Sequence, residues 1–224
     1  MNLDTDFLWS VFLKALAKLP VNFEIAIVAL VVAIPLGLLA AIVCNNKVPV
    51  ASQALKVFVS FIRSTPPILL ILIIYYVKKS LDMQGVIKID PIWYAIFIFS
   101  LIEIALLTEV FRSALLSIPA TQLEAAESIG MTKLQGYRRI VIPQVLGVAL
   151  PVLCSSITDL VKMTSLAFAL TVVDIMAIAK IEGGFSLSFM EAYLAVSLIY
   201  LIVVFVLERI FKIFERFTKS YADK

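Results

Sequence analysis

The sequence predicts an all-α membrane protein with about five transmembrane helices, and three observations carry this prediction. First, 62% of the 224 residues are hydrophobic, only 16% are charged, and the mean hydropathy is +1.05. A soluble domain averages about 45–50% apolar and about 25% charged residues. Second, the apolar excess lies in runs of roughly 20 residues, the length that an α-helix needs to cross a bilayer. Third, no stretch long enough for a large soluble domain lies outside these runs, so residues 1–224 are expected to form one membrane domain.

The first elements along the chain are an interfacial helix and a span. Residues 3–19 place apolar side chains at helical spacing, with Lys14 and Lys18 on the opposite side. This pattern predicts a helix that lies in the membrane interface. The first span follows over residues 23–43, with Pro35 in its interior. Membrane helices tolerate such a residue when neighbouring groups satisfy the freed backbone atoms.

Four further apolar runs complete the predicted spans, over residues 57–77, 91–111, 140–160 and 189–207. Asp174 interrupts another apolar stretch, which favours a short re-entrant or interfacial helix there over a full span. Five spans place the two ends of the chain on opposite sides of the membrane. Lys and Arg residues are in excess on the side that holds residues 116–139 and the C-terminus, so this side is predicted to be cytoplasmic.

The longest polar stretch between apolar runs is EAAESIGMTKLQGYRRIVIP, residues 124–143. It opens with good helix formers, Gly130 then interrupts them, and a basic segment leads into the next span. These features predict a short surface helix, a turn at Gly130 with positive φ, and a second basic piece. Such a loop, within residues 116–139, is suited to transmit movement from one side of the membrane to the spans.

This stretch resembles the EAA loop of permease subunits in bacterial ABC importers. The positions that carry the resemblance are Glu124, Ala125, Ala126, Gly130, Ile140 and Pro143. Ile142 stands where the family has Leu, and the alternative is an ordinary amphipathic loop. The wider order of segments resembles the polar amino-acid uptake group, which includes histidine, glutamine and cystine permeases.

Two other segments resemble the same group. Residues 63–67, RSTPP, are similar to the Arg-Gly-Thr-Pro start of the family's second span, with Ser64 in place of Gly. Residues 162–166, KMTSL, are similar to the signature K-D-T-S-L, with Met163 in place of Asp. That difference leaves the role of Met163 open.

The resemblance implies a type I ABC importer permease fold with a cytoplasmic coupling helix at about residues 120–130. It implies a multi-pass protein of the bacterial cell membrane that binds no cofactor itself, because ATP and Mg belong to the partner ATPases. The implied partners are a cytoplasmic ATPase dimer, a second permease copy (identical or related), an external amino-acid-binding protein and the lipid bilayer, with no nucleic acid. The implied substrate is a polar or sulfur-containing amino acid such as cystine.

The residues themselves exclude several kinds of site. The chain has no histidine, no Gly-rich phosphate loop and no pairing of a nucleophile with a base, so we expect no metal site, no ATP site of that kind and no catalysis by this chain alone. Polar groups inside spans are expensive unless they face the protein interior or a watery cavity. The candidate substrate-pathway residues are therefore Glu103, Asp159, Lys162, Thr164 and Ser165.

Glu103 has two interpretations. Its carboxylate is suited to hold the ammonium group of a substrate, or it is protonated or paired with Arg63 or Lys162 in a structural network. Asp159 and Lys162 are three residues apart and can pair with each other.

A second set of residues is predicted to form a gate or a structural contact. Arg63, Thr65 and Pro66 belong to it, at the start of the second span. Glu109 and Arg112 belong to it as well, because they are three residues apart and can form an ion pair on one helix face.

Two other classes of protein remain as alternatives. A secondary transporter or channel would work without ATP, but the chain shows no clear internal repeat and this class leaves the loop motif unexplained. A membrane scaffold or sensor would not need charged groups inside spans. Co-purification of a soluble ATPase distinguishes both from an ABC permease.

Overall fold

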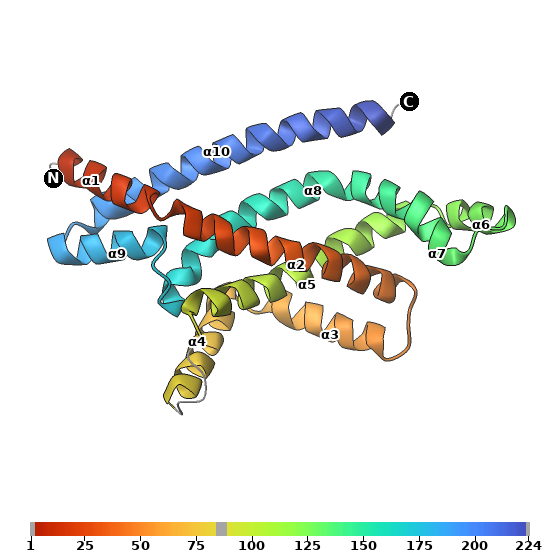
Figure 1. The fold of residues 1–224 in the computed structure, drawn as a ribbon, viewed down its shortest axis with the longest axis horizontal. Helices are drawn as coiled ribbons and strands as arrows, with labels where there is room; N and C mark the ends of the chain where they lie inside the picture. The colour runs from red at the N-terminus through yellow and green to blue at the C-terminus, as the bar shows by residue number, and fades with distance from the viewer. Residues whose placement is uncertain (1–2, 84–88, 223–224) are drawn as a thin grey trace.

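The computed structural model describes residues 3–83 and 89–222, and every regular element in these ranges is helical (Figure 1). The all-α prediction is confirmed for this part of the chain. The longer helices are α1 (Thr5–Leu16), α2 (Leu19–Asn45), α3 (Ala51–Ser64), α4 (Pro67–Met83), α5 (Pro91–Ser117), α8 (Ile142–Met163), α9 (Ile175–Ser186) and α10 (Phe189–Ala222). The shorter ones are α6 (Thr121–Ser128), α7 (Lys133–Gly136), the π-helix η1 (Tyr137–Val141) and the 3₁₀-helix η2 (Thr164–Leu170).

Four helical stretches of the described residues are long and apolar enough to cross a membrane. They are Thr5–Asn45, Pro91–Ser117, Lys133–Leu170 and Phe189–Phe214. A fifth is obtained when the bent pair formed by α3 and α4 is counted as one span. These numbers match the four to five spans of a small polytopic membrane protein.

The centre of the fold is the packing of α2 against α5. The face of α2 that is buried carries small side chains, which allow two helix backbones to approach closely. They are Ala26, Ala29, Ala33, Gly37 and Ala41. A Cβ atom on Gly37 would lie 2.9 Å from Cβ of Leu107 and 3.3 Å from the backbone nitrogen of Thr108. This glycine is therefore needed for the close contact between the two helices.

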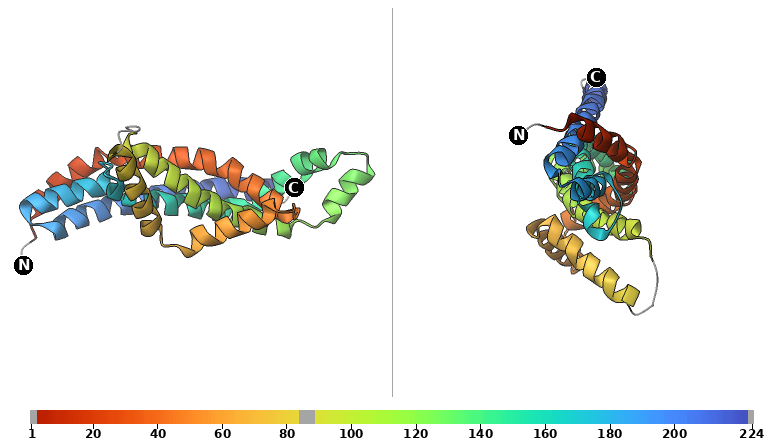
Figure 2. Two further views of the ribbon diagram at one scale, coloured as in Figure 1. Left: turned by 90° about the horizontal axis from the view of Figure 1, so that it is seen from below. Right: turned by 90° about the vertical axis from the view of Figure 1, so that its left-hand side faces the viewer.

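The predicted span over residues 57–77 falls on two helices, α3 and α4, which are bent by 103° relative to each other. Thr65 between them is extended, with φ −96° and ψ 128°. The following residues, Pro66 and Pro67, have no N–H to donate, and a proline disfavours helical backbone in the residue before it. Figure 2 shows α4 projecting away from the other helices as a result.

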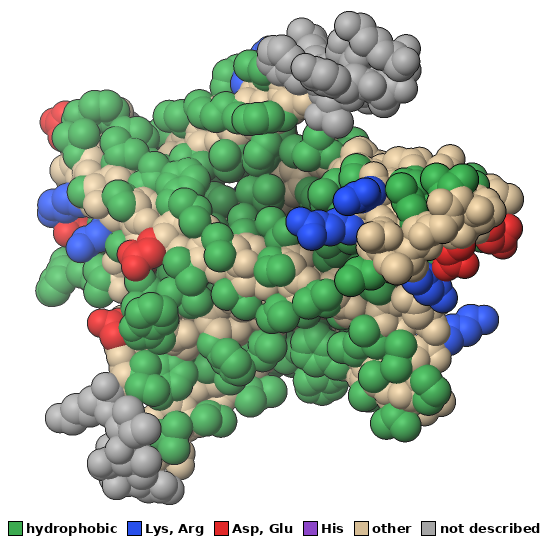
Figure 3. Space-filling view, turned by 45° about the vertical axis from the view of Figure 1, so that its right-hand side comes forward, with side chains coloured by type: hydrophobic (Ala, Val, Ile, Leu, Met, Phe, Trp, Pro, Cys, Tyr) green, Lys and Arg blue, Asp and Glu red, His purple; other side chains and the backbone are tan. Residues whose placement is uncertain are grey.

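The two ends of the bundle differ in character. The loop with α6 and α7 extends from one end, whereas α1, α9 and the start of α10 lie together at the other (Figures 1 and 2). Val11 and Ala15 of α1 are fully buried, in the same core cluster as Ala192 of α10 and Ala179 of α9. The predicted interfacial helix thus packs along α9 and α10. Figure 3 shows hydrophobic side chains over the middle of one face and charged side chains toward its ends, the distribution expected of a surface in lipid.

Candidate functional site

The polar loop predicted from the motif forms a compact helix–turn–helix at one end of the bundle. α6 ends at Ser128, and Gly130 follows with φ +85°, which confirms the predicted positive φ. No atom lies within 4 Å of the position that a Cβ on Gly130 would take, so its backbone conformation, rather than lack of space, favours glycine there. The next helix is started by a capping box between Thr132 and Gln135.

The motif residues of this loop divide into an inner and an outer set. Ala126 is buried, whereas Glu124 and Ala125 are exposed. Two large apolar side chains on the same protrusion are also exposed, Ile129 at 75% and Leu134 at 78%. A cavity of about 540 Å³ lies behind the loop, and Leu116, Leu123 and Tyr137 are among the residues that line it.

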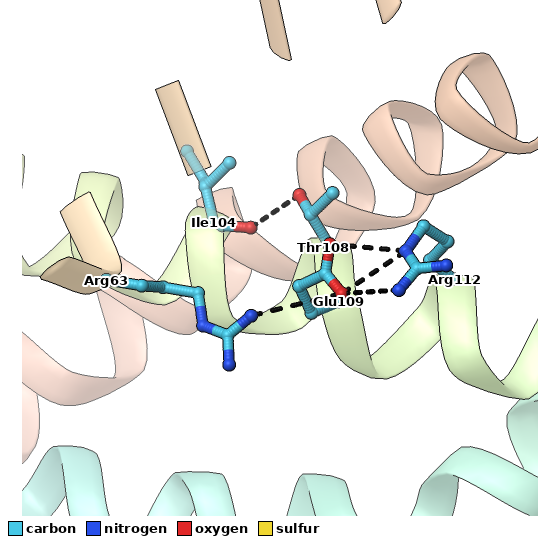
Figure 4. Close-up of polar contacts among 5 residues, drawn as sticks. All are labelled: Arg63, Ile104, Thr108, Glu109 and Arg112. Atoms are coloured by element: carbon cyan, nitrogen blue, oxygen red, sulfur yellow. Dashed lines mark hydrogen bonds and ion pairs between the residues drawn. The ribbon is translucent and has the colours of Figure 1, made fainter. Parts of the chain in front are cut away.

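Three of the predicted gate or structural residues, Arg63, Glu109 and Arg112, meet at the junction of α3 and α5 (Figure 4). The guanidinium of Arg112 donates to both carboxylate oxygens of Glu109, with Nη2 2.7 Å from Oε2. The predicted pairing of these two residues is confirmed. Nη1 of Arg63 lies 3.9 Å from the same Oε2, so α3 is joined to α5 by a longer ion pair. The Thr65 hydroxyl donates to the carbonyl of Phe61 at 2.8 Å, one turn before the bend.

Glu103 is fully buried on α5, and neither carboxylate oxygen has a hydrogen-bond partner among the described residues. The structural alternative of an ion pair with Arg63 or Lys162 is wrong in this conformation, because Arg63 pairs with Glu109 and Lys162 with Asp159. Ser156 and Asp159 of α8 are polar side chains close to it. A buried carboxyl without a partner is costly, so it marks a place where another group is expected to bind.

The other predicted pathway residues lie at the end of α8, in two environments. Asp159 and Lys162 pair at 2.6 Å, and both side chains are exposed, at 65% and 51%. Thr164 is buried, and Ser165 is partly buried. The structure therefore brings Asp159 near Glu103 but directs Thr164 into the protein interior.

Thr164 belongs to a buried polar network that the sequence analysis did not identify. Nδ2 of Asn22 on α2 lies 3.0 Å from Oγ1 of Thr164, 3.2 Å from Oδ2 of Asp174 and 3.3 Å from the hydroxyl of Tyr200. Asn22 also accepts a hydrogen bond from the backbone N–H of Ile175, and Asp174 caps α9 by accepting from Ala177 at 2.8 Å. The network joins α2, η2, α9 and α10. The only sequence signals for it were polar residues within apolar stretches, with separations of 142 to 178 residues between partners.

The fold and this site define a polytopic helical membrane protein with buried polar groups between its spans and a helix–turn–helix protruding at one end. Residues 33–220 match the family of binding-protein-dependent transport system inner membrane components. The chain belongs to this family. Its resemblance to ABC importer permeases of the polar amino-acid uptake group is confirmed, and it is a multi-pass membrane transport component.

Curated relatives cover nearly the whole chain. The "Probable amino-acid permease protein YxeN" of Bacillus subtilis (strain 168) is 37% identical over 215 residues, 96% of this chain and 96% of that protein. The "L-cystine transport system permease protein TcyL" of the same organism is 33% identical over 225 residues, 98% of this chain and 92% of that protein. The "Octopine transport system permease protein OccM" of Rhizobium radiobacter is 30% identical over 220 residues, which are 96% of this chain and 90% of that protein.

Solved structures of transporters share the fold. One described as an amino acid ABC transporter with histidines has a TM-score of 0.78 at 22% identity, covering 96% of this chain and 98% of that one. An inward-facing MetNI methionine ABC transporter has a TM-score of 0.75 at 18% identity, with coverages of 97% and 99%. At these identities the likeness concerns the fold, and the predicted type I permease fold is confirmed.

Proposed function

We propose that this chain is the membrane-spanning subunit of an ATP-driven importer of a polar or sulfur-containing amino acid, with cystine as the first candidate. Amino-acid and cystine permeases among the relatives, at 33–37% identity over nearly the full length, support the substrate class. The chain is not catalytic alone. It forms the substrate pathway, and ATP with Mg binds to the partner ATPases.

The observation that carries this proposal is the protruding α6–Gly130–α7 loop. Its motif residues Glu124 and Ala125 are exposed, and the exposed Ile129 and Leu134 give it apolar contact surface at an otherwise polar end. Ala126 anchors the loop to the body of the protein because it is buried. A rigid protrusion of this kind suits a groove on a soluble partner that moves when it binds ATP.

The rest of the assembly follows from this role. Two permease copies, identical or related, enclose the pathway around a two-fold axis, since one small set of spans is too few to surround it. An external binding protein delivers the amino acid, and two cytoplasmic ATPases bind the coupling loops. The C-terminus and the coupling loop lie in the cytoplasm, as the Lys and Arg bias indicates. Glu103, Asp159, Lys162, Thr164 and Ser165 belong to the pathway, and the bend at Arg63, Thr65 and Pro66 with the Glu109–Arg112 pair belongs to a gate.

Co-purification tests the proposal. The permease carrying an affinity tag is isolated in mild detergent from cells of its own source, which supply any partner ATPase. We expect the ATPase to be retained at one copy per permease and to be lost when residues 120–130 are replaced by a Gly/Ser linker. A secondary transporter or channel retains no ATPase, and that result would exclude the proposed function.

A further inference from the structure

A cavity of about 390 Å³ lies between the end of α8 and the C-terminal part of α10. The polar residues that line it are Ser155, Thr158, Asp159, Lys162, Glu208 and Lys212. The first four belong to α8, and Glu208 and Lys212 belong to α10. Ligand pockets commonly have volumes of about 300–1,000 Å³. The cavity therefore has room for a small molecule and contains two acidic and two basic groups.

Only two of the four charged side chains form an ion pair with each other. Asp159 and Lys162 pair across one turn of α8 at 2.6 Å. Glu208 and Lys212 are one turn apart on α10, yet within the described ranges neither forms an ion pair with any residue. Among the residues whose side chains the structure describes, a carboxylate and an ammonium thus remain unpaired at the same cavity. Both side chains are exposed on the single chain, so each is available to a ligand group of opposite sign.

The last span was predicted to end at residue 207, so Glu208 and Lys212 fell outside it, whereas in the structure the apolar stretch of α10 continues to Phe214 and includes both. Only the packing of α10 along α8 brings them to Asp159 and Lys162. Asp159 also lies close to Glu103 of α5. The cavity is consequently adjacent to the buried carboxyl of the proposed pathway.

We infer that the α8–α10 cavity is a binding site for a zwitterionic amino acid, with Glu208 holding its ammonium group and Lys212 its carboxylate. This inference rests on the proposed function and names two specificity residues for it. Balanced charge in the cavity favours a ligand with both charges over one with a single charge, because a singly charged ligand leaves Glu208 or Lys212 unmatched. Recognition of both charges requires no particular side chain, which is suited to a site that acts after a selective binding protein.

Equilibrium binding to the permease–ATPase complex in nanodiscs, without the binding protein, tests the site. The probes are L-cystine and L-histidine, their amines cystamine and histamine, and their deaminated acids 3,3′-dithiodipropionate and imidazolepropionate. We expect one amino acid to bind at least about tenfold more tightly than its amine or acid, the scale of one lost charged contact. Glu208→Gln should weaken binding of the amino acid about tenfold and leave binding of the deaminated acid unchanged. Lys212→Gln should weaken binding of the amino acid to a similar extent and leave binding of the amine unchanged.

Arg209→Gln is the matched control. Arg209 lies beside Glu208 on α10, does not line the cavity and stacks on the ring of Phe205 at 4.8 Å. This variant should bind every probe as the wild type does, and the charge-keeping variants Glu208→Asp and Lys212→Arg should retain most of the affinity. Loss of cystine and histidine binding in Arg209→Gln to the same extent as in Glu208→Gln would overturn the inference, because the effect would then be one of general tail charge.

The wild-type complex decides the matter even if a variant does not assemble. Equal affinity for an amino acid and its amine or acid would contradict the site. So would binding of neither amino acid by a complex that imports one of them with its binding protein, and in that case the proposed function would stand. A complex with no ATP-dependent import of either amino acid would overturn the proposed function, and the inference with it.

Discussion

Oε2 of Glu109 lies 2.7 Å from Nη2 of Arg112 but 3.9 Å from Nη1 of Arg63. The short contact is within α5, and the long one joins α5 to α3 just before the bend at Pro66. Glu109 is thus held by its own helix and is only loosely connected to the next one. This arrangement allows α3 to move relative to α5 while the acid remains matched by Arg112.

Reversing the charges of this pair tests its contribution. Glu109→Arg and Arg112→Glu should each lower transport, and the double variant should recover more than either single one. Recovery should be incomplete, because Glu109→Arg leaves Arg63 facing a second cation. The side chains are about one-third exposed, so the coupling energy should be only about 0.5–1 kcal/mol in thermal unfolding of the complex. Strictly additive losses would show that the two residues do not interact.

Gly130 tests the backbone of the coupling loop. A left-handed conformation costs an ordinary residue about 1–2 kcal/mol, whereas Asn adopts it more readily. Gly130→Val should therefore reduce ATPase retention and uncouple ATP hydrolysis from uptake, and Gly130→Asn should retain most of both. Both variants have open space for a side chain. Equal and severe loss in the two would instead indicate that the ATPase contacts this position directly.

Glu103→Gln tests the buried carboxyl. The change keeps shape and hydrogen bonding but removes the charge available to a substrate ammonium. We expect the apparent KM for uptake to rise about tenfold, with protein yield, thermal stability and basal ATPase activity unchanged. Unchanged uptake at low substrate concentration in a well-folded Glu103→Gln complex would remove Glu103 from the pathway.

The network around Asn22 predicts a stability effect. Asn22→Leu removes the donor to Thr164, Asp174 and Tyr200 and leaves the buried Asp174 with fewer partners. The expected loss is about 1–3 kcal/mol, seen as a Tm lower by several degrees. Tyr200→Phe removes one of three acceptors that share two N–H hydrogens, so its effect should be smaller. A larger effect of Tyr200→Phe than of Asn22→Leu would contradict this account of the network.

The sequence predicted those parts of the fold that depend on local pattern. Long apolar runs indicate the spans because a bilayer requires about 20 apolar residues, and Gly130 indicates the turn because its conformation favours glycine. The pair of Glu109 and Arg112 is a matter of helix spacing, which the sequence contains directly. These predictions needed no information about which helices are neighbours.

The remaining features depend on packing between distant segments. Asn22 was not among the residues selected from the sequence, and only the fold brings it to Asp174, 152 residues away. Glu208 and Lys212 lie beyond the span predicted over residues 189–207, and only the packing of α10 along α8 brings them to the cavity. The angle of the bend at Pro66 could not be predicted from the sequence either. Prolines indicate that the helix breaks, but the packing of neighbouring helices determines the angle.

The most direct test of the central claim is amino-acid uptake into proteoliposomes that contain the permease–ATPase complex. The binding protein and labelled L-cystine or L-histidine are outside, and Mg-ATP is inside. The account predicts accumulation of one amino acid above its outside concentration only when ATP and the binding protein are both present, and none with a non-hydrolysable ATP analogue. Accumulation driven by an ion gradient without ATP, or uptake that continues without the ATPase, would contradict it.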